Sequence, residues 1–183
     1  MKYNLRRITE FNRLILENCC DKDKVAVDAT CGNGKDTLFL AQHCLKVYGF
    51  DIQKQAIENT ETLLRENNVT NYQLFNDSFS RMEELVPEGA DIIVFNLGYL
   101  PGGDKNITTT AEETLKGLKA ALAILKPHGT ISMTLYWGHP QGKIERETVL
   151  QYCRSLDGKA YHITYLSLPN QDNCPPEIIL INN

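Results

Sequence analysis

The sequence lacks long apolar runs. Nowhere do about 18 apolar residues follow one another, the length that a membrane-spanning helix needs. The basic residues near the N-terminus are followed by no apolar segment, so no secretory signal is predicted. Hydrophobic residues make up 42% and charged residues 23% of the 183 residues, as in an ordinary globular protein. We therefore expect a single cytoplasmic domain, residues 1–183, without a membrane segment.

Cysteine pairs of metal-binding or redox type are also missing. The six cysteines form no CxxC motif and no zinc-ligand spacing; they are Cys19, Cys20, Cys31, Cys44, Cys153 and Cys174. We expect them to be small buried side chains or thiols without a chemical role. No metal site is predicted.

An excess of basic residues is absent as well. The net charge is −4, so the composition does not by itself indicate a nucleic-acid binder. Lys2, Arg6, Arg7 and Arg13 nevertheless give the N-terminal segment a basic character. Two interpretations stay open for these residues, a solvated helix face and a local patch for RNA phosphates. Arg6 and Arg7 are our candidates for RNA contact.

Strand and helix patterns alternate along the chain. Buried strands are predicted over residues 24–29, 46–51, 72–76, 90–96 and 129–137, and helices over 8–18, 36–43, 52–67, 109–125 and 144–155. Residues 126–129 are interpreted as a helix stop and turn, and residues 160–168 and 177–181 as a closing hairpin. This alternation predicts an α/β fold: a mostly parallel sheet with helices on both faces and a C-terminal antiparallel hairpin.

A glycine-bearing loop joins the first predicted strand to its helix. Gly32 and Gly34 let the backbone approach a ligand, and the helix that follows presents free N–H groups. Asp51 ends the second strand, where a carboxylate can accept hydrogen bonds from both ribose hydroxyls of an adenosine. A tight turn and a helix N-cap are the structural alternatives for the glycines and for Asp51.

The loop also indicates the kind of cofactor. A dinucleotide fingerprint requires a third glycine at the position of Thr37. Asp28 would repel a pyrophosphate but can bind an amino group, directly or through water. The pattern favours S-adenosylmethionine over a dinucleotide; a NAD-binding oxidoreductase and a non-catalytic nucleotide-binding module are the alternatives from another class. The cofactor site assigned here comprises Asp28, Thr30, Gly32, Asn33, Gly34, Asp36, Thr37, Asp51 and Ile52.

Asp77 and Ser78 follow the third strand. Methyltransferases of this fold commonly contact the adenine amino group at this place, so both residues join the predicted cofactor site. A turn-forming aspartate is the equally weighted alternative.

The segment Asn96-Leu97-Gly98-Tyr99 follows the most apolar strand and resembles the Asn-Pro-Pro-Tyr motif of amino-group methyltransferases, with Leu97 and Gly98 in place of the prolines. Methyl transfer is an in-line displacement, so the nucleophile must be aligned with the methyl group. An asparagine carbonyl can accept a hydrogen bond from a substrate N–H, and an aromatic ring can stack on a base. Asn96 and Tyr99 are therefore predicted catalytic residues, and Asn96 and Gly98 also border the cofactor. A simple glycine-rich turn is the alternative.

Two further segments are predicted to reach the acceptor. Lys105 lies in the loop after Tyr99, and Tyr136, Gly138 and His139 follow the fifth strand. Tyr136 and His139 are candidates to contact the acceptor or to take its proton. An aromatic strand end and a turn histidine are equally consistent with the sequence.

Four motifs together resemble one family: VDATCGNGKDTLFLA, GFDIQKQAI, FNLGYLPGGDK and LYWGHPQGK. They are similar to the small bacterial methyltransferases of the putative rRNA methylase family, associated with transfer-RNA wobble-uridine modification. The resemblance implies conversion of 5-aminomethyl-2-thiouridine to its methylaminomethyl form in the anticodon stem-loop, with S-adenosylmethionine as methyl donor. It places Asn33, Asp51 and Gln53 on the cofactor, and it implies a homodimer. Ribosomal RNA and a small-molecule amine remain alternative substrates.

Overall fold

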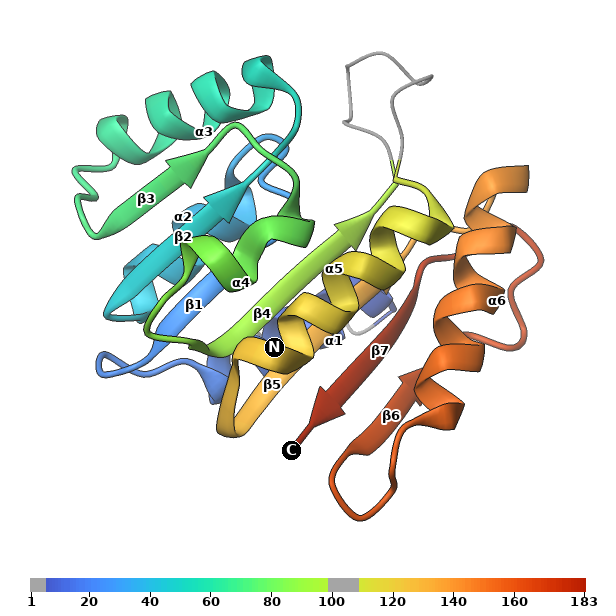
Figure 1. The fold of residues 1–183 in the computed structure, drawn as a ribbon. Coiled ribbons are helices and arrows are strands. Elements are labelled where there is room, and N and C mark those ends of the chain that lie inside the picture. Colours follow the sequence, from blue (N-terminus) through green and yellow to red (C-terminus); the bar gives the residue numbers. More distant parts are fainter. Residues whose placement is uncertain (1–5, 99–108) are drawn as a thin grey trace.

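The protein is described as a computed structural model, which covers residues 6–98 and 109–183. Seven strands of these residues form one sheet in the order β3-β2-β1-β4-β5-β7-β6 (Figure 1). The strands are β1 (Val25–Asp28), β2 (Lys46–Phe50), β3 (Tyr72–Phe75), β4 (Ala90–Leu97), β5 (Leu125–Leu135), β6 (His162–Leu166) and β7 (Glu177–Asn182).

The helices lie between these strands in the chain. They are α1 (Ile8–Cys19), α2 (Lys35–His43), α3 (Lys54–Glu66), α4 (Met82–Leu85), α5 (Ala111–Ile124) and α6 (Pro140–Ser155), with a short 3-10 helix, η1 (Phe79–Arg81), before α4. Local sequence explains the start of two of them. Thr110 caps α5 by accepting a hydrogen bond from the Glu113 N–H, and α6 begins with Pro140, whose fixed φ suits a first helical position.

Strand pairing creates a switch point between β1 and β4. Both strands are parallel to each other, and Val27 of β1 pairs with Tyr48 of β2 on one side and with Ile93 of β4 on the other. The chain builds outward from β1 to β3 in one direction and from β4 to β5 in the opposite direction. Sheets of this kind bind ligands at the carboxyl ends of the strands beside such a switch point. At the far side, β7 is antiparallel to both β5 and β6, which confirms the predicted hairpin.

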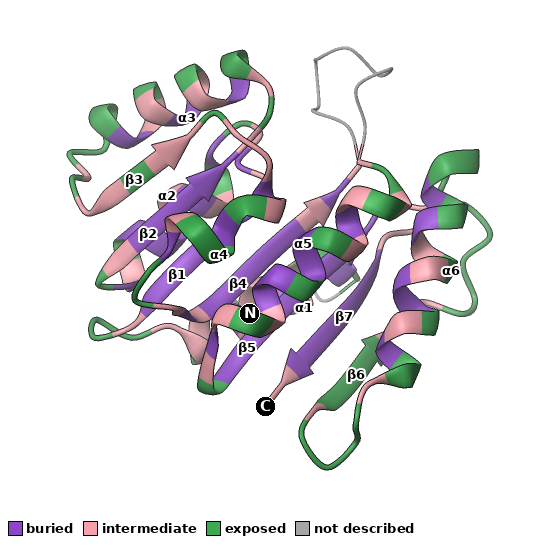
Figure 2. Ribbon diagram, in the orientation of Figure 1, coloured by how far each residue is buried: buried purple, intermediate pink, exposed green. Residues whose placement is uncertain are grey.

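The alternation of side chains along the strands divides the core between two faces, and the buried strands are purple in Figure 2. On one face, Ile93 and Phe95 of β4 pack with Phe79, Leu118 and Val149 from η1, α5 and α6. On the other, Ile92 and Val94 pack with residues of α1, α2 and α3, namely Leu16, Leu40 and Leu64. Because both faces carry helices, the strands read as continuous apolar runs in the sequence.

The structure differs from the predictions mainly in three regions. Residues 126–129, interpreted as a turn, belong to β5, which begins directly after α5; they form an irregularity in the pairing with β4, and His128 has a φ of 64°. α6 begins four residues earlier than predicted, since His139 and Pro140 form its cap and first position. η1 and α4 were not predicted, because three- and four-residue helices carry too short a pattern.

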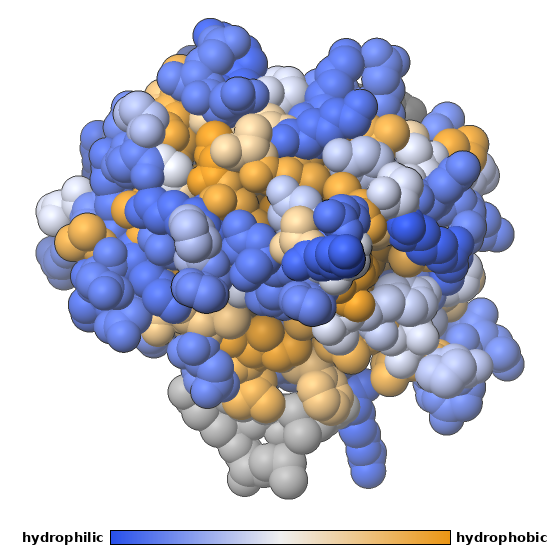
Figure 3. Space-filling view, turned by 60° about the horizontal axis from the view of Figure 1, so that its bottom comes forward, coloured by the Kyte–Doolittle hydropathy of each residue, from blue (hydrophilic) through white to orange (hydrophobic). Residues whose placement is uncertain are grey.

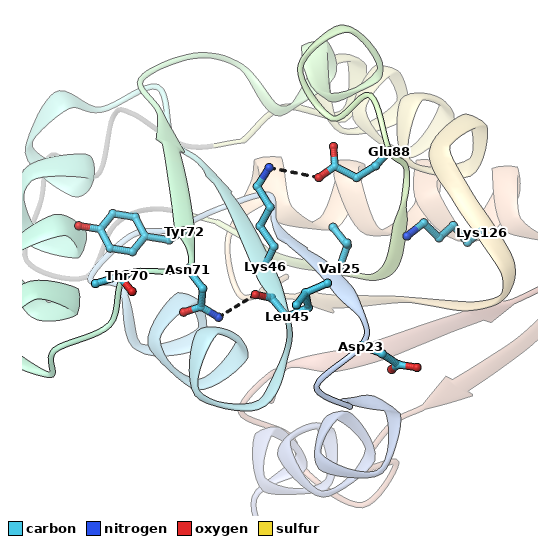
Figure 4. A pocket seen from close by; sticks show the side chains of 9 residues that line it. All are labelled: Asp23, Val25, Leu45, Lys46, Thr70, Asn71, Tyr72, Glu88 and Lys126. Atoms are coloured by element: carbon cyan, nitrogen blue, oxygen red, sulfur yellow. Dashed lines mark hydrogen bonds and ion pairs between the residues drawn. The ribbon is translucent and has the colours of Figure 1, made fainter.

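A hollow at the amino ends of the strands is shown in Figure 4. It lies between the starts of β1, β2 and β3, where Lys46 forms an ion pair with Glu88 and Asn71 donates a hydrogen bond to the Leu45 carbonyl. Hydrophilic residues interspersed with apolar ones make up the face in Figure 3. None of the residues lining this hollow is a predicted site residue.

Of the helices in residues 6–98 and 109–183, none is long and apolar enough to span a bilayer.

Candidate active site at the carboxyl ends of the strands

The glycine loop turns sharply between β1 and α2. Gly32 and Gly34 have φ values of 52° and 77°, which glycine adopts at no steric cost. The Cys31 N–H donates to the Phe50 carbonyl at 2.9 Å, so the loop is attached to the end of β2. A Cβ at Gly34 would lie 2.9 Å from the Cα of Thr60 in α3. The loop therefore requires glycine at this position, and its backbone is held between α3 and the sheet.

Asp28 and Thr37 lie beneath this loop. Both side chains are fully buried, and the Asp28 carboxylate accepts hydrogen bonds from the Thr37 hydroxyl at 2.6 Å and from the Thr30 N–H at 3.1 Å. Burial, and secondarily the charge of Asp36, raise the pKa of Asp28 to about 7. The structure thus shows Asp28 and Thr37 supporting the loop from below; ligand contact by either remains a prediction. Thr37 supplies the hydroxyl that binds Asp28, and a glycine at this position could not make that hydrogen bond.

Asp51 faces the loop from the end of β2. Its carboxylate accepts hydrogen bonds from the Gly32 N–H and from the Gln53 N–H, both at 2.9 Å, and partial burial raises its pKa. The next residue, Ile52, is 61% exposed. A fixed acid beside an exposed apolar side chain suits a ribose diol and the ring attached to it. Asn33 lies exposed in the loop, and Gln53 is the N-cap residue of α3.

Asn76 is a residue that sequence reasoning missed. Its amide nitrogen donates to the carbonyl oxygens of Asp51 and Ile52 at 3.0 and 2.9 Å. It thereby fixes the chain after β2 against the end of β3. The signal available in the sequence was its place as the last residue of a predicted strand, which it shares with many residues that have no such role.

Asp77 and Ser78 have structural partners of their own. Asp77 accepts the Ser78 N–H at 2.8 Å and forms an ion pair with Arg81. Ser78 caps η1 and donates its hydroxyl hydrogen to Glu113 at 3.2 Å. These contacts match the turn-forming alternative, and an adenine contact by either residue stays a prediction.

Asn96 is the partly buried next-to-last residue of β4 and is held at two points. Its backbone N–H donates to the Thr30 hydroxyl at 2.7 Å, and its amide nitrogen Nδ2 donates to Asp36 Oδ2 at 2.8 Å. Asp36 lies in the first turn of α2, and its other oxygen accepts a hydrogen bond from Arg13. Three of the predicted cofactor-site residues, Thr30, Asp36 and Asn96, are therefore joined directly.

Tyr136 lies on the same edge, after β5. Its N–H donates to the Leu97 carbonyl at 3.3 Å, and a Cβ at Gly98 would lie 3.5 Å from the Tyr136 Cβ. The side chain is 40% exposed, and its pKa is raised by burial and then by the charge of Asp36. Tyr136 thus lies beside Gly98, just after Asn96 in the chain, and is partly exposed; contact with an acceptor stays a prediction.

His139 is the N-cap of α6. Its Nδ1 accepts the Gly142 N–H at 3.1 Å, an arrangement that uses one ring nitrogen for the fold. Nearby, the buried Glu145 carboxylate accepts a hydrogen bond from Thr114 at 2.6 Å; burial raises the pKa of Glu145, and this hydrogen bond opposes the rise. A catalytic role for His139 is a prediction that these contacts do not test.

The remaining predicted substrate contacts are dispersed. Arg6 and Arg7 are exposed just before α1, and Gly138 is exposed between Tyr136 and α6. Tyr99 and Lys105 lie outside the described residues. The structure thus brings together the glycine loop, Asp51, Asn96 and Tyr136, whereas Arg6 and Arg7 belong to a separate element.

Comparison with known proteins gives a family match and a curated relative. The family model described as "Putative rRNA methylase" matches residues 47–182. The chain is 43% identical over 161 residues to a tRNA (mnm(5)s(2)U34)-methyltransferase, chloroplastic, of Arabidopsis thaliana; the match covers 80% of this chain and 59% of that protein, so the chain spans about three fifths of its length.

Two solved structures are similar over almost their full length. A structure described as a putative rRNA-methylase from Clostridium thermocellum has a TM-score of 0.93 at 34% identity, covering 96% of this chain and 97% of that one. A putative methyltransferase from Streptococcus mutans in complex with SAH has a TM-score of 0.90 at 35% identity, with the same coverage. These likenesses confirm the predicted Rossmann-like methyltransferase fold.

Proposed function

This chain belongs to the putative rRNA methylase family, and from that premise we propose that it is an S-adenosylmethionine-dependent RNA methyltransferase that methylates a primary amine. The most specific substrate we propose is the aminomethyl group of 5-aminomethyl-2-thiouridine at the tRNA wobble position, which would become 5-methylaminomethyl-2-thiouridine. The observation that carries the proposal is the anchored side chain of Asn96, which ends β4 with its amide nitrogen bonded to Asp36.

The cofactor is S-adenosylmethionine, the methyl-bearing counterpart of the SAH bound in the Streptococcus mutans relative. When bound, it supplies an electrophilic methyl group on a sulfonium. The residues present fit it: Asp51 offers a fixed carboxylate for ribose hydroxyls, exposed Ile52 an apolar surface, and the loop from Gly32 to Gly34 a close backbone approach. We propose Asn33, Asp51 and Gln53 as cofactor contacts.

The acceptor side depends on the orientation of one amide. Because Nδ2 of Asn96 faces Asp36, the carbonyl oxygen Oδ1 lies on the other branch of the amide and is the group suited to accept an amine N–H. Such a hydrogen bond directs the nitrogen lone pair, which is what an in-line displacement requires. An ammonium has no lone pair, so the acceptor must be neutral when it reacts.

The RNA partner is proposed from family membership and from exposed groups near this edge. Tyr136 is partly exposed beside Gly98, where its ring can stack on a base. Arg6 and Arg7 are exposed before α1 and can contact phosphates. We propose the anticodon stem-loop as the RNA element and a homodimer as the assembly; light scattering tests the latter.

The reaction is tested with labelled S-adenosylmethionine on bulk tRNA lacking the terminal wobble methylation, followed by nucleoside mass spectrometry. We expect methylaminomethyl-thiouridine to appear at the expense of the aminomethyl form, and Asn96→Ala to abolish this. Label on ribosomal RNA alone, as the family description suggests, would transfer the proposal to that substrate and remove the tRNA one.

A further inference from the structure

Arg13 of α1 is held between two groups of α2. Its Nη2 lies 2.5 Å from Asp36 Oδ1, and its guanidinium carbon lies 4.0 Å from the centre of the Phe39 ring. Asp36 and Phe39 are one turn apart on α2 and so present both contacts on one helix face. The side chains of Arg13 and Asp36 are 27% and 30% exposed, and this partial burial shields their ion pair from full solvent screening.

The second oxygen of Asp36 continues the connection to Asn96. Oδ2 accepts the Nδ2 hydrogen of Asn96 at 2.8 Å, so a single carboxylate bridges Arg13 and the predicted catalytic amide. An Asn96 side chain turned over by 180° would present its carbonyl oxygen to the carboxylate and lose this hydrogen bond. The bridge therefore sets which atom of Asn96 can face an acceptor.

Charge gives Arg13 a second effect. The charged or titratable groups that act on Asp36 or respond to its charge are Arg13 from α1, Asp28 from β1 and Tyr136 after β5. Among the ion pairs of residues 6–98 and 109–183, Arg13 supplies the cation for Asp36. An unpaired carboxylate near an amine favours its ammonium form, whereas a paired one does so less. Since only the neutral amine can accept a methyl group, neutralising Asp36 favours the reactive form.

We propose that Arg13 is a positioning residue for methyl transfer: through Asp36 it fixes the amide of Asn96 and keeps the acceptor amine from being held as an ammonium. The inference rests on the proposed amine methylation. Arg13 itself contacts neither the reacting nitrogen nor the methyl group in this role.

The charge effect is tested by the pH dependence of kcat. Arg13→Gln keeps a hydrogen-bond donor but removes the charge, and we expect the acidic midpoint of the profile to rise by about one pH unit. Arg13→Lys restores the charge and should restore the midpoint. The matched control is Arg65→Gln, which removes an arginine paired with Glu61 at 2.6 Å on the exposed face of α3 and should leave the profile unchanged. An unshifted midpoint in Arg13→Gln overturns the charge effect.

A double variant separates charge from general damage. In an Asp36→Asn background there is no carboxylate to neutralise, so Arg13→Gln should no longer raise the midpoint; the coupling between the two changes is the quantity measured. A shift of equal size in both backgrounds contradicts the proposal.

A measurement without substrate keeps this proposal distinct from the proposed function. The side-chain amide protons of Asn96, identified by NMR from their absence in Asn96→Asp, should exchange faster in Arg13→Ala, which removes the hydrogen-bond donor to Asp36, than in the wild type and in Arg65→Ala. Unchanged exchange rejects the positioning role even if tRNA is methylated. If exchange is faster but the protein methylates no amine, the positioning of Asn96 by Arg13 through Asp36 is supported and only the proposed function is rejected.

Discussion

The two halves of the site are built differently. The cofactor half uses residues close to each other along β1, β2 and their loops, and backbone N–H groups bonded to the carboxylates of Asp28 and Asp51 hold it together. The acceptor half joins side chains from α1, α2 and β4: Arg13 contacts Asp36, 23 residues away in the sequence, and Asp36 contacts Asn96, 60 residues away. The first half is fixed by main-chain geometry, and the second by a few side-chain contacts that single substitutions can remove.

The largest expected effect concerns the acceptor half. Asn96→Ala removes the amide that we propose orients the amine, and we expect kcat to fall by roughly 100- to 1,000-fold. The affinity for SAH, measured by calorimetry, should stay within a few-fold, because Asp51 and the loop are untouched. A loss of SAH binding with normal kcat at saturation would assign Asn96 to the cofactor half instead.

The second-largest effect is expected at Asp28, the buried acid beneath the glycine loop. The pKa of Asp28 is raised to about 7, so its protonated form is favoured in the folded state and the stability it contributes at low pH is lost as the pH rises from about 4 to 7. Asp28→Asn cannot ionise. Its free energy of unfolding relative to the wild type should therefore increase by about 4 kcal/mol between pH 4 and pH 8.

Urea unfolding of both proteins at the two pH values measures this difference. Any effect of the substitution on packing that does not depend on pH is the same at both values and cancels. A relative stability that is the same at both would mean that Asp28 ionises as readily when buried as in the unfolded chain.

Asp51→Ala should affect only the cofactor half. It removes the acceptor of two backbone N–H groups and the proposed ribose contact, so we expect SAH affinity to fall about tenfold or more. Asp157→Ala is a matched control, since Asp157 also accepts the N–H of the residue two positions on, at 3.0 Å, but lies exposed before β6. Equal affinities for the two variants would remove Asp51 from the cofactor site.

The smallest effect is expected at the N-terminal basic residues. Replacing Arg6 and Arg7 with alanine should weaken tRNA binding a few-fold at moderate salt and lower the slope of log affinity against log salt by about one to two. Replacing Arg65 and Arg154, which are exposed on α3 and α6, controls for net charge. An identical slope in both double variants would favour the interpretation that Arg6 and Arg7 lie on a solvated helix face and do not contact RNA.

The sequence predicted the fold well where the pattern was long. Every strand of the parallel part was placed within a few residues, because apolar runs flanked by helical periodicity leave few other interpretations. It failed at residues 126–129, where proline and glycine suggested a turn but pairing with β4 extends the strand around them. It assigned Asp28 and Thr37 to the cofactor site; the structure shows both completely buried beneath the loop, which the sequence could not reveal, and ligand contact by either stays a prediction.

What the sequence determined by itself is the α/β order, the glycine loop, and the acid and amide that end β2 and β4, because these follow from local spacing along the chain. Only the tertiary structure decided that Arg13 reaches Asp36, that Asp36 holds Asn96, and that Asn76 fastens the end of β3 to β2. Residues so far apart in the chain become neighbours only when helices pack on the sheet, and no periodicity encodes which side chains then meet.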